Sequence, residues 1–208
     1  VLKKLFTFLS LEGVHLTHVP TWKNHMLKEP VERVRELRED EAEQFEAAMR
    51  SDYEPLFAFV RATGMRQKEC VTLRWSEVDW GEQQIVKLGK GDRRVTFPIT
   101  IAIRSILWPL KSHHPLFVFT YIAQRTRKGS MIKGVRYPVT LSGVKTRWRR
   151  MRKEAGVSDF RFHDFRHDFA TKLLRQTGNL KLVSRALNHK KIETTLKYAH
   201  VQNDEIAA

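Results

Sequence analysis

The pattern of hydrophobic and polar positions predicts helices at both ends of the chain and a group of short strands between them. In the first half, helices are expected over residues 37–49, 56–62 and about 67–73, with a break at Gly64. Alternating runs separated by turn sequences predict an antiparallel sheet of about three strands over residues 78–80, 84–88 and 93–99. Because the strands are grouped rather than alternating with helices, the expected fold class is α+β and mostly α-helical, with one small three-stranded antiparallel sheet.

The second half returns to helical periodicity. A helix is expected over about 100–110, followed by a basic loop, "QRTRKGSMIKGVRYP", and by a helix over about 142–155. In that helix Val144, Trp148 and Met151 recur at i, i+4 and i+7, and Gly156 suits a stop just past its end. Further helices fit "HDFRHDFATKLLRQTG", "LKLVSRALN" and "KIETTLKYAHV".

The last of these segments holds a tyrosine whose role the periodicity leaves open. If the segment is an α-helix, Ile192, Leu196 and Ala199 form one apolar stripe. Tyr198 then lies about 120° from Ile192, so packing of the stripe does not require its ring. Tyr198 is a packed aromatic residue, a surface residue or a nucleophile, and other parts of the chain must decide between these.

The first 33 residues differ from the rest. Residues 1–12 read as the end of a helix with Leu2, Leu5, Phe6 and Leu9 on one face, and Gly13, Pro20 and Pro30 then interrupt any periodicity. We therefore expect residues 1–33 to be the end of a truncated N-terminal domain plus a linker, and residues 34–208 to form the main domain. The chain starts at Val1 in mid-pattern, which suggests a fragment of a longer protein.

Charge indicates the kind of partner. The 208 residues include 38 Lys and Arg against 23 Asp and Glu, a net charge of +15 with a pI near 10.2. Such a chain favours a polyanion, most often nucleic acid, or an anionic membrane surface. No apolar run approaches the roughly 20 residues that span a bilayer, so no membrane role is expected. The single cysteine, Cys70, excludes an intramolecular disulfide and a Cys-rich zinc site and fits a reducing cytoplasm.

The segment "FRFHDFRHDFATKLL" carries candidate chemistry. His163 and Arg166 are three residues apart, so a helix places an imidazole and a guanidinium on the same side. A solvated basic face is the alternative interpretation. His163 and His167 also have the i, i+4 spacing of a zinc pair, but Asp164 stands where the zinc-protease motif has Glu, and no third ligand is identifiable. No metal and no cofactor are expected.

These motifs are weak one by one, but four segments that occur in a fixed order are stronger evidence together. They are "ATGMRQKECVTLRW", "LGKGDRRVTFP", "FHDFRHDFATKLL" and "LNHKKIETTLKYAHV". Over about residues 37–201 this order resembles the tyrosine recombinase family, which includes the phage integrases. The resemblance identifies the catalytic residues as Arg66, Lys90, His163, Arg166, His189 and the nucleophile Tyr198, with Glu69 in support. It also implies the catalytic-domain fold of that family for residues 34–208 and a core-binding domain before it.

The chemistry that the resemblance implies is exchange of one phosphoester for another without metal or ATP. Tyr198 attacks phosphorus and leaves a 3′-phosphotyrosyl link, while Arg66 and Arg166 bind the non-bridging oxygens. Lys90, on a hairpin tip, protonates the departing 5′ oxygen. His163 handles or orients protons, and His189 donates to a non-bridging oxygen. Glu69 either orients a group of the site or forms a simple i, i+3 surface pair with Arg66.

Basic residues beyond the site predict contact with the phosphates of double-stranded DNA, against the alternative of a solvated face. The candidates lie in the 142–155 helix and the preceding loop: Lys145, Arg147, Arg149, Arg150, Arg127 and Lys128. The resemblance further implies a homo-multimer, a tetramer on paired DNA sites, in a bacterial or phage-encoded protein of the cytoplasm associated with the nucleoid. Two other functions remain open: a type IB topoisomerase, which usually has lysine where His163 stands, and a non-catalytic DNA-binding relative.

Overall fold

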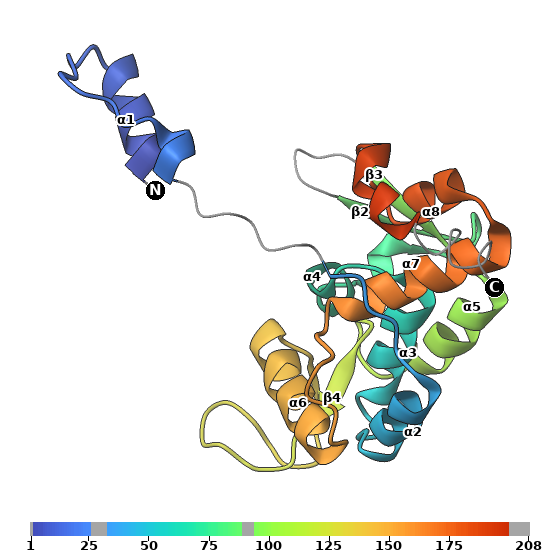
Figure 1. Cartoon of the computed structure of the whole chain (residues 1–208). Coiled ribbons are helices and arrows are strands. Elements are labelled where there is room, and N and C mark those ends of the chain that lie inside the picture. The colour runs from blue at the N-terminus through green and yellow to red at the C-terminus, as the bar shows by residue number, and fades with distance from the viewer. Residues whose placement is uncertain (1, 26–32, 89–93, 200–208) are drawn as a thin grey trace. The chain divides into compact units, whose positions relative to one another are not determined.

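A computed structural model describes residues 2–25, 33–88 and 94–199. The chain forms two compact units, Val1–Arg33 and Val34–Ala208 (Figure 1). In the first unit, α1 (Leu2–Leu11) is followed by a 3-10 turn, Trp22–His25, and the rings of Phe6 and Trp22 meet edge to face at 5.3 Å. No described residue of α1 is buried. That this unit ends an N-terminal domain stays a prediction.

The second unit contains the helices that the periodicity predicts, with small shifts of their ends. They are α2 (Glu39–Ala47), α3 (Glu54–Thr63), α4 (Gln67–Val71), α5 (Ile101–Leu107), α6 (Leu141–Glu154), α7 (Asp164–Thr177) and α8 (Leu180–Ala186). Gly64 ends α3 with φ of +60°, a conformation that glycine adopts without strain. Asparagine and threonine side chains cap the starts of α5, α6 and α8. No helix of the described ranges is long and apolar enough to cross a bilayer.

The expected three-stranded sheet is present, and its order is β1-β2-β3. The strands are β1 (Val78–Asp79), β2 (Gln84–Leu88) and β3 (Arg94–Pro98), with 3-10 turns at Trp75–Glu77 and Trp108–Leu110 on either side of this region. Both pairings are antiparallel, and Ile85 lies opposite both Val78 and Phe97. These three side chains are buried, so this face of the sheet joins the core.

A second, two-stranded sheet, which the sequence did not predict, begins just before the predicted basic loop (residues 124–138) and ends within it. Strand β4 (Thr120–Ile122) pairs antiparallel with β5 (Arg136–Pro138), and an isolated bridge joins Arg127 to Met131 farther along the hairpin. The loop prediction was wrong at its end, where β5 lies, and β4 was missed, because the hairpin arms are three residues long, too short to show a period of two. This hairpin precedes α6 directly and lies beside it (Figure 1).

The core of the second unit is aromatic and encloses the buried face of α6. Trp148 lies within 4.9–6.1 Å, centroid to centroid, of the rings of Phe45, Phe57, Phe160, Phe162 and Phe165. Val144 and Met151 are fully buried on the same stripe, as the spacing predicts. Close aromatic packing of this kind fixes α6 and the start of α7 against α2 and α3.

The final segment differs from the predicted helix. It consists of two 3-10 turns, Ile192–Thr194 and Leu196–Tyr198. Ile192 and Leu196, the expected apolar stripe, are 42% and 53% exposed, whereas Tyr198 is fully buried. The prediction was wrong because a 3-10 helix advances one turn in three residues, which places Thr195 and Tyr198 on one face. Both of these side chains are 0% exposed.

Candidate active site on α7

Helix α7 brings the predicted residues together because it packs between α3 and α8 in the middle of the second unit (Figure 1). Four residues at its start, from Asp164 to His167, are buried, and His163 stands just before the helix as its N-cap. We call Arg66, His163, Arg166, His167 and Tyr198 the α7 cluster.

Arg166 occupies the centre of the α7 cluster and is 4% exposed. Its guanidinium donates to the carbonyl of Gly64 at 2.8 Å and to that of Leu187 at 2.6 Å. These carbonyls lie at the end of α3 and the end of α8, so three helices fix one planar group. The pKa of Arg166 is lowered to about 10, first by burial and then by the charge of Arg66, with Tyr198 acting in the opposite direction. The guanidinium therefore still carries its proton at neutral pH.

Gly64 is required where α3 approaches α7. A Cβ at this position would lie 2.5 Å from a ring carbon of Phe169 and 3.2 Å from a methyl of Leu187. Together with the φ of +60°, this close approach explains why glycine precedes the segment that carries Arg66. The Gly64 carbonyl is thereby held within reach of Arg166.

Arg66 is the exposed counterpart of Arg166. It caps α4, and Glu69 accepts from its backbone N–H at 3.0 Å and from its guanidinium at 3.2 Å. Glu69 therefore makes the i, i+3 pair that was one of its two predicted roles. Half of the Arg66 side chain remains exposed, and its charge lies close enough to Arg166 to lower the pKa of that residue.

Tyr198 contacts α7 through His167, a residue that no sequence pattern linked to it. The Tyr198 hydroxyl and the Nδ1 atom of His167 are 2.9 Å apart, and both side chains are buried. His163 stacks edge to face on His167 at 5.2 Å, which makes a row of three rings. Desolvation, and then the charge of Arg166, lowers the pKa of His163, so this imidazole is neutral at pH 7.

The hydrogen bond between His167 and Tyr198 joins residues 31 positions apart, and no local pattern could have indicated it. The sequence presented His167 as a possible zinc ligand beside His163. In the structure its Nδ1 atom faces the tyrosine instead. Within the described ranges, no group of three or more His, Cys, Asp or Glu side chains could hold a metal ion.

His189 and Lys90 have different outcomes. His189 is half-buried, its Nδ1 atom lies 2.7 Å from the hydroxyl of Thr195, and its backbone N–H donates to Ser184. It therefore holds the turn that precedes Tyr198 against the end of α8. Lys90 lies outside the described residues, and its role stays a prediction. The nearby Lys87 is buried and forms an ion pair with Glu77 at 2.7 Å, so it is already engaged.

The predicted DNA contacts lie on α6 and the β4–β5 hairpin. Most of their side chains are exposed, namely Lys145, Arg149, Arg150, Arg127 and Lys128. Arg147 differs because its side chain is 13% exposed and donates to the carbonyl of Ala48 and to Glu154 at 3.1 Å. Arg147 thus anchors α6 to the end of α2, a role that its sequence position did not reveal.

Comparison with known proteins places this geometry in context. The integrase of Salmonella phage P22 is 25% identical over 199 residues, which cover 92% of this chain and 48% of that protein. The tyrosine recombinase XerC of Pediococcus pentosaceus is 30% identical over 146 residues, 69% of this chain and 48% of that protein. The chain thus spans about half the length of these curated relatives.

Solved structures share the fold. A lambda integrase dimer bound to a COC′ core site superposes with a TM-score of 0.69 at 19% identity, over 93% of this chain and 55% of that chain. XerA recombinase gives 0.62 at 24% identity, over 99% and 72%. The sequence of residues 35–205 matches the phage integrase family, a span that contains the whole α7 cluster. The chain therefore belongs to the phage integrase family.

Proposed function

We propose that this chain is the catalytic part of a site-specific recombinase or integrase that cuts and rejoins double-stranded DNA through a 3′-phosphotyrosyl intermediate. The observation that carries the proposal is the position of Arg166, a buried and still charged guanidinium with Arg66 and Tyr198 as electrostatic neighbours. The names of the relatives, integrase and tyrosine recombinase, support a recombinase over the topoisomerase that the sequence left open.

In the proposed reaction the Tyr198 hydroxyl gives its proton to a base of the site, its oxygen attacks phosphorus, and the bond between phosphorus and the 5′ oxygen breaks. Arg66 and Arg166 hold the non-bridging oxygens, where negative charge accumulates in the transition state. Lys90 gives a proton to the leaving 5′ oxygen, and His163, neutral at pH 7, orients or relays protons beside the phosphate. A 5′ hydroxyl then attacks the phosphotyrosine and restores a phosphodiester. The number of ester bonds is unchanged, so no ATP is needed.

Tyr198 must leave its buried position for this attack. The turns that carry it expose Ile192 and Leu196, so the apolar packing that the movement must break is mainly that of the Tyr198 ring against its buried neighbours, Ala170, Leu174, Val183 and Leu187. The contacts of Tyr198 with His167 and of Thr195 with His189 are the polar ties that a small hinge would release. We propose that DNA in the site promotes this movement.

The whole protein acts on paired DNA sites as a homo-multimer, which we propose to be a tetramer. A relative is named as a dimer on a core site, and others are named as recombinase complexes with their DNA substrates. The phage and transposon sources of several relatives support a mobile-element or phage origin, with action in the bacterial cytoplasm at the nucleoid.

A nicked suicide duplex that carries the protein's own site tests the proposal. The wild-type chain should form a covalent adduct that denaturing electrophoresis detects, and Tyr198→Phe should abolish it while binding to the duplex persists. A wild type that binds but never forms an adduct would instead support a non-catalytic DNA-binding relative. Strand exchange between two sites, rather than relaxation of a plasmid, separates a recombinase from a topoisomerase.

A further inference from the structure

The chain enters the second unit through four residues, 34–37, which lie just before α2 (Figure 1). They belong to no helix or strand, yet each is at least partly buried. We call them the strap. The strap contacts α7 at Asp168 and at Arg175, which are seven residues apart and therefore lie on one side of the helix, about two turns from each other.

Two polar contacts fix the strap to α7. The backbone N–H of Leu37 donates to Oδ1 of Asp168 at 3.0 Å, and both residues are buried. The Arg175 guanidinium donates to the two carboxylate oxygens of Glu36 at 2.8 and 3.0 Å. Hydrogen bonds to a charged group are stronger than those between neutral groups, and the forked pair also sets direction. The second half of the strap is therefore fixed to α7 in one position.

The first half of the strap takes part in burying Tyr198. Val34 packs against a small apolar cluster that is separate from the main core of the second unit. The buried members of this cluster are Ala170, Leu174, Val183, Leu187 and Tyr198. With so few members, each side chain that packs on the cluster contributes a large share of its apolar contacts. Burial of Tyr198 thus depends in part on the residue that begins the unit.

A second route joins the strap to Tyr198 through α7. Asp168, which accepts from Leu37, directly follows His167, and Nδ1 of His167 lies 2.9 Å from the Tyr198 hydroxyl. Asp168, His167 and Tyr198 are all buried. Because adjacent residues share a planar peptide unit, movement of Asp168 carries His167 with it. The strap and the phenol therefore meet the same turn of α7.

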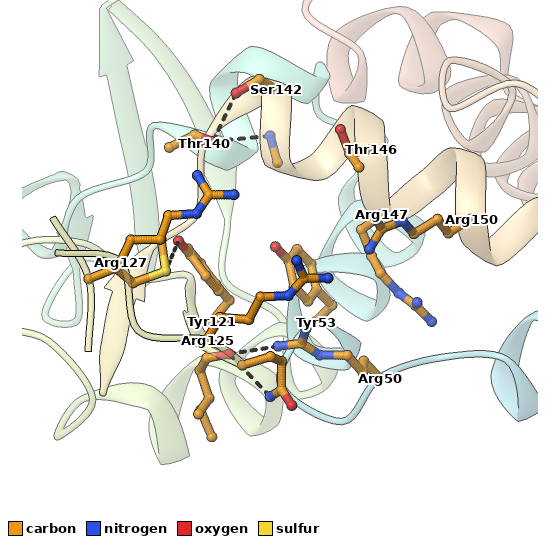
Figure 2. Close-up of a pocket in the computed structure, with 14 residues that line it drawn as sticks. Arg50, Tyr53, Tyr121, Arg125, Arg127, Thr140, Ser142, Thr146, Arg147 and Arg150 are labelled. Atoms are coloured by element: carbon orange, nitrogen blue, oxygen red, sulfur yellow. Dashed lines mark hydrogen bonds between the residues drawn. The ribbon is translucent and has the colours of Figure 1, made fainter. Parts of the chain in front are cut away.

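The strap also holds its positive charge in a pair within the protein. Arg35 donates to both carboxylate oxygens of Glu41, and its guanidinium lies 5.1 Å from the centre of the Phe160 ring. The arginines of the β4–β5 hairpin are placed differently, since Figure 2 shows Arg125 and Arg127 lining an open hollow. The strap is therefore suited to attachment within the chain rather than to contact with DNA.

We propose that the strap controls the release of Tyr198 from its buried position. With the strap seated on α7, Val34 packs on the cluster and the tyrosine stays buried. Withdrawal of the strap removes Val34 from the cluster and the Leu37 N–H from Asp168, so the turn that carries Tyr198 opens more readily. Each release favours the other, because coupling between two sites is reciprocal. The inference rests on the proposed function, since it adds a control to the movement that precedes attack.

Hydrogen exchange of the 208-residue chain without DNA, followed by NMR, tests this coupling. The Leu37 amide reports the strap, and the amides of residues 195–199 report the tyrosine turn. Val34→Ala shortens the side chain that packs on the cluster. Val95→Ala is the matched control, because Val95 is also partly buried but packs against the main core. Thermal melts establish that both variants are folded.

Val34→Ala should speed exchange about fivefold or more at Leu37 and at residues 195–199 together, because loss of the packing frees both segments. Val95→Ala should leave both sets of amides within about twofold of the wild type. Faster exchange in only one of the two segments would overturn the proposal, since the strap and the turn would then open independently. Unchanged exchange in both segments of Val34→Ala would overturn it as well.

The ion pair of the strap provides an independent test. Glu36→Gln removes the carboxylate that Arg175 holds, and Glu46→Gln removes the partner of Arg61, in a pair between α2 and α3. Both variants raise the net charge by one. Glu36→Gln should speed exchange about twofold to threefold in the strap and in the turn, because partly exposed ion pairs are weak. An equal change in Glu46→Gln would contradict a specific role of the strap.

Adduct formation on the nicked duplex shows whether the strap limits attack. At saturating duplex, Val34→Ala should form the adduct about threefold faster than the wild type, because less packing opposes release of the tyrosine. A slower or unchanged rate would overturn control of attack by the strap. The exchange measurements need neither DNA nor catalysis. A chain that never forms an adduct therefore refutes the proposed function, while exchange alone decides whether strap and turn are coupled.

Discussion

The two groups of arginines in this protein are held in opposite ways. Arg166 is buried and satisfied by two main-chain carbonyls from separate helices. Arg149 and Arg150 on α6 are exposed. A guanidinium fixed before the substrate arrives stabilises a transition state without further reorganisation, whereas a solvated one attracts DNA over a distance and adapts to it. We therefore propose that Arg166 supplies catalytic charge and that Arg149 and Arg150 supply binding charge, while Arg66, half exposed, lies between the two cases.

The sharpest test of the comparison replaces Arg166 by methionine. Formation of the covalent adduct should slow by about 10²–10³-fold, because one preorganised donor to the phosphate is lost. The free energy of unfolding should change by less than about 2 kcal/mol, because loss of two hydrogen bonds is offset by removal of a buried charge. Adduct kinetics and urea denaturation measure the two effects. A large loss of stability with normal adduct formation would contradict the assignment.

Gly64→Ala should mainly lower stability, whereas Arg166→Met should mainly slow adduct formation. The left-handed backbone and the 2.5 Å approach of Phe169 oppose a Cβ, so the variant should lose about 2–4 kcal/mol of stability. The loss is measured by urea denaturation. Gly129→Ala is a matched control, since its φ is also positive but no atom lies within 4 Å of the added Cβ. If both variants lose equal stability, backbone strain alone is responsible and the packing of α3 on α7 is not.

His167→Phe keeps an aromatic ring beside Tyr198 but removes the hydrogen bond at 2.9 Å. The buried phenol then lacks this partner, which should destabilise the turn with Tyr198 buried by about 1–2 kcal/mol. Backbone amides of residues 195–199 should exchange with deuterium about tenfold faster, while those of α6 stay unchanged. Unchanged exchange in the turn would show that His167 does not hold the tyrosine.

The smallest effect is expected for Arg149, an exposed arginine of α6. Arg149→Gln should leave the melting temperature within about a degree, because surface substitutions rarely change stability. Duplex affinity should fall only a few-fold, with a salt slope lower by about one. Anisotropy at several salt concentrations measures both. A change in the adduct rate at saturating DNA would place Arg149 in the catalytic site. The distinction between Arg166 and the exposed arginines of α6 would then fail.

Some of this organisation follows from local sequence. The 3.6-residue stripe of α6, the alternation of β2 and β3 and the stop at Gly64 are recorded in adjacent residues, and the structure confirms each. The H-x-x-R motif likewise predicted that His163 and Arg166 would lie together. The β4–β5 arms were missed because three residues are too few for a period.

The sequence by itself determined the helices up to α8, the three-stranded sheet, the positive charge and the family, because each of these depends on residue types at short or ordered spacings. Only the tertiary structure decided which charges are buried, that Tyr198 rests on His167, and that the carbonyls of Gly64 and Leu187 hold Arg166. Those contacts join residues 21 to 102 positions apart, two of them through main-chain atoms that every residue possesses. No pattern of side chains can record such a contact.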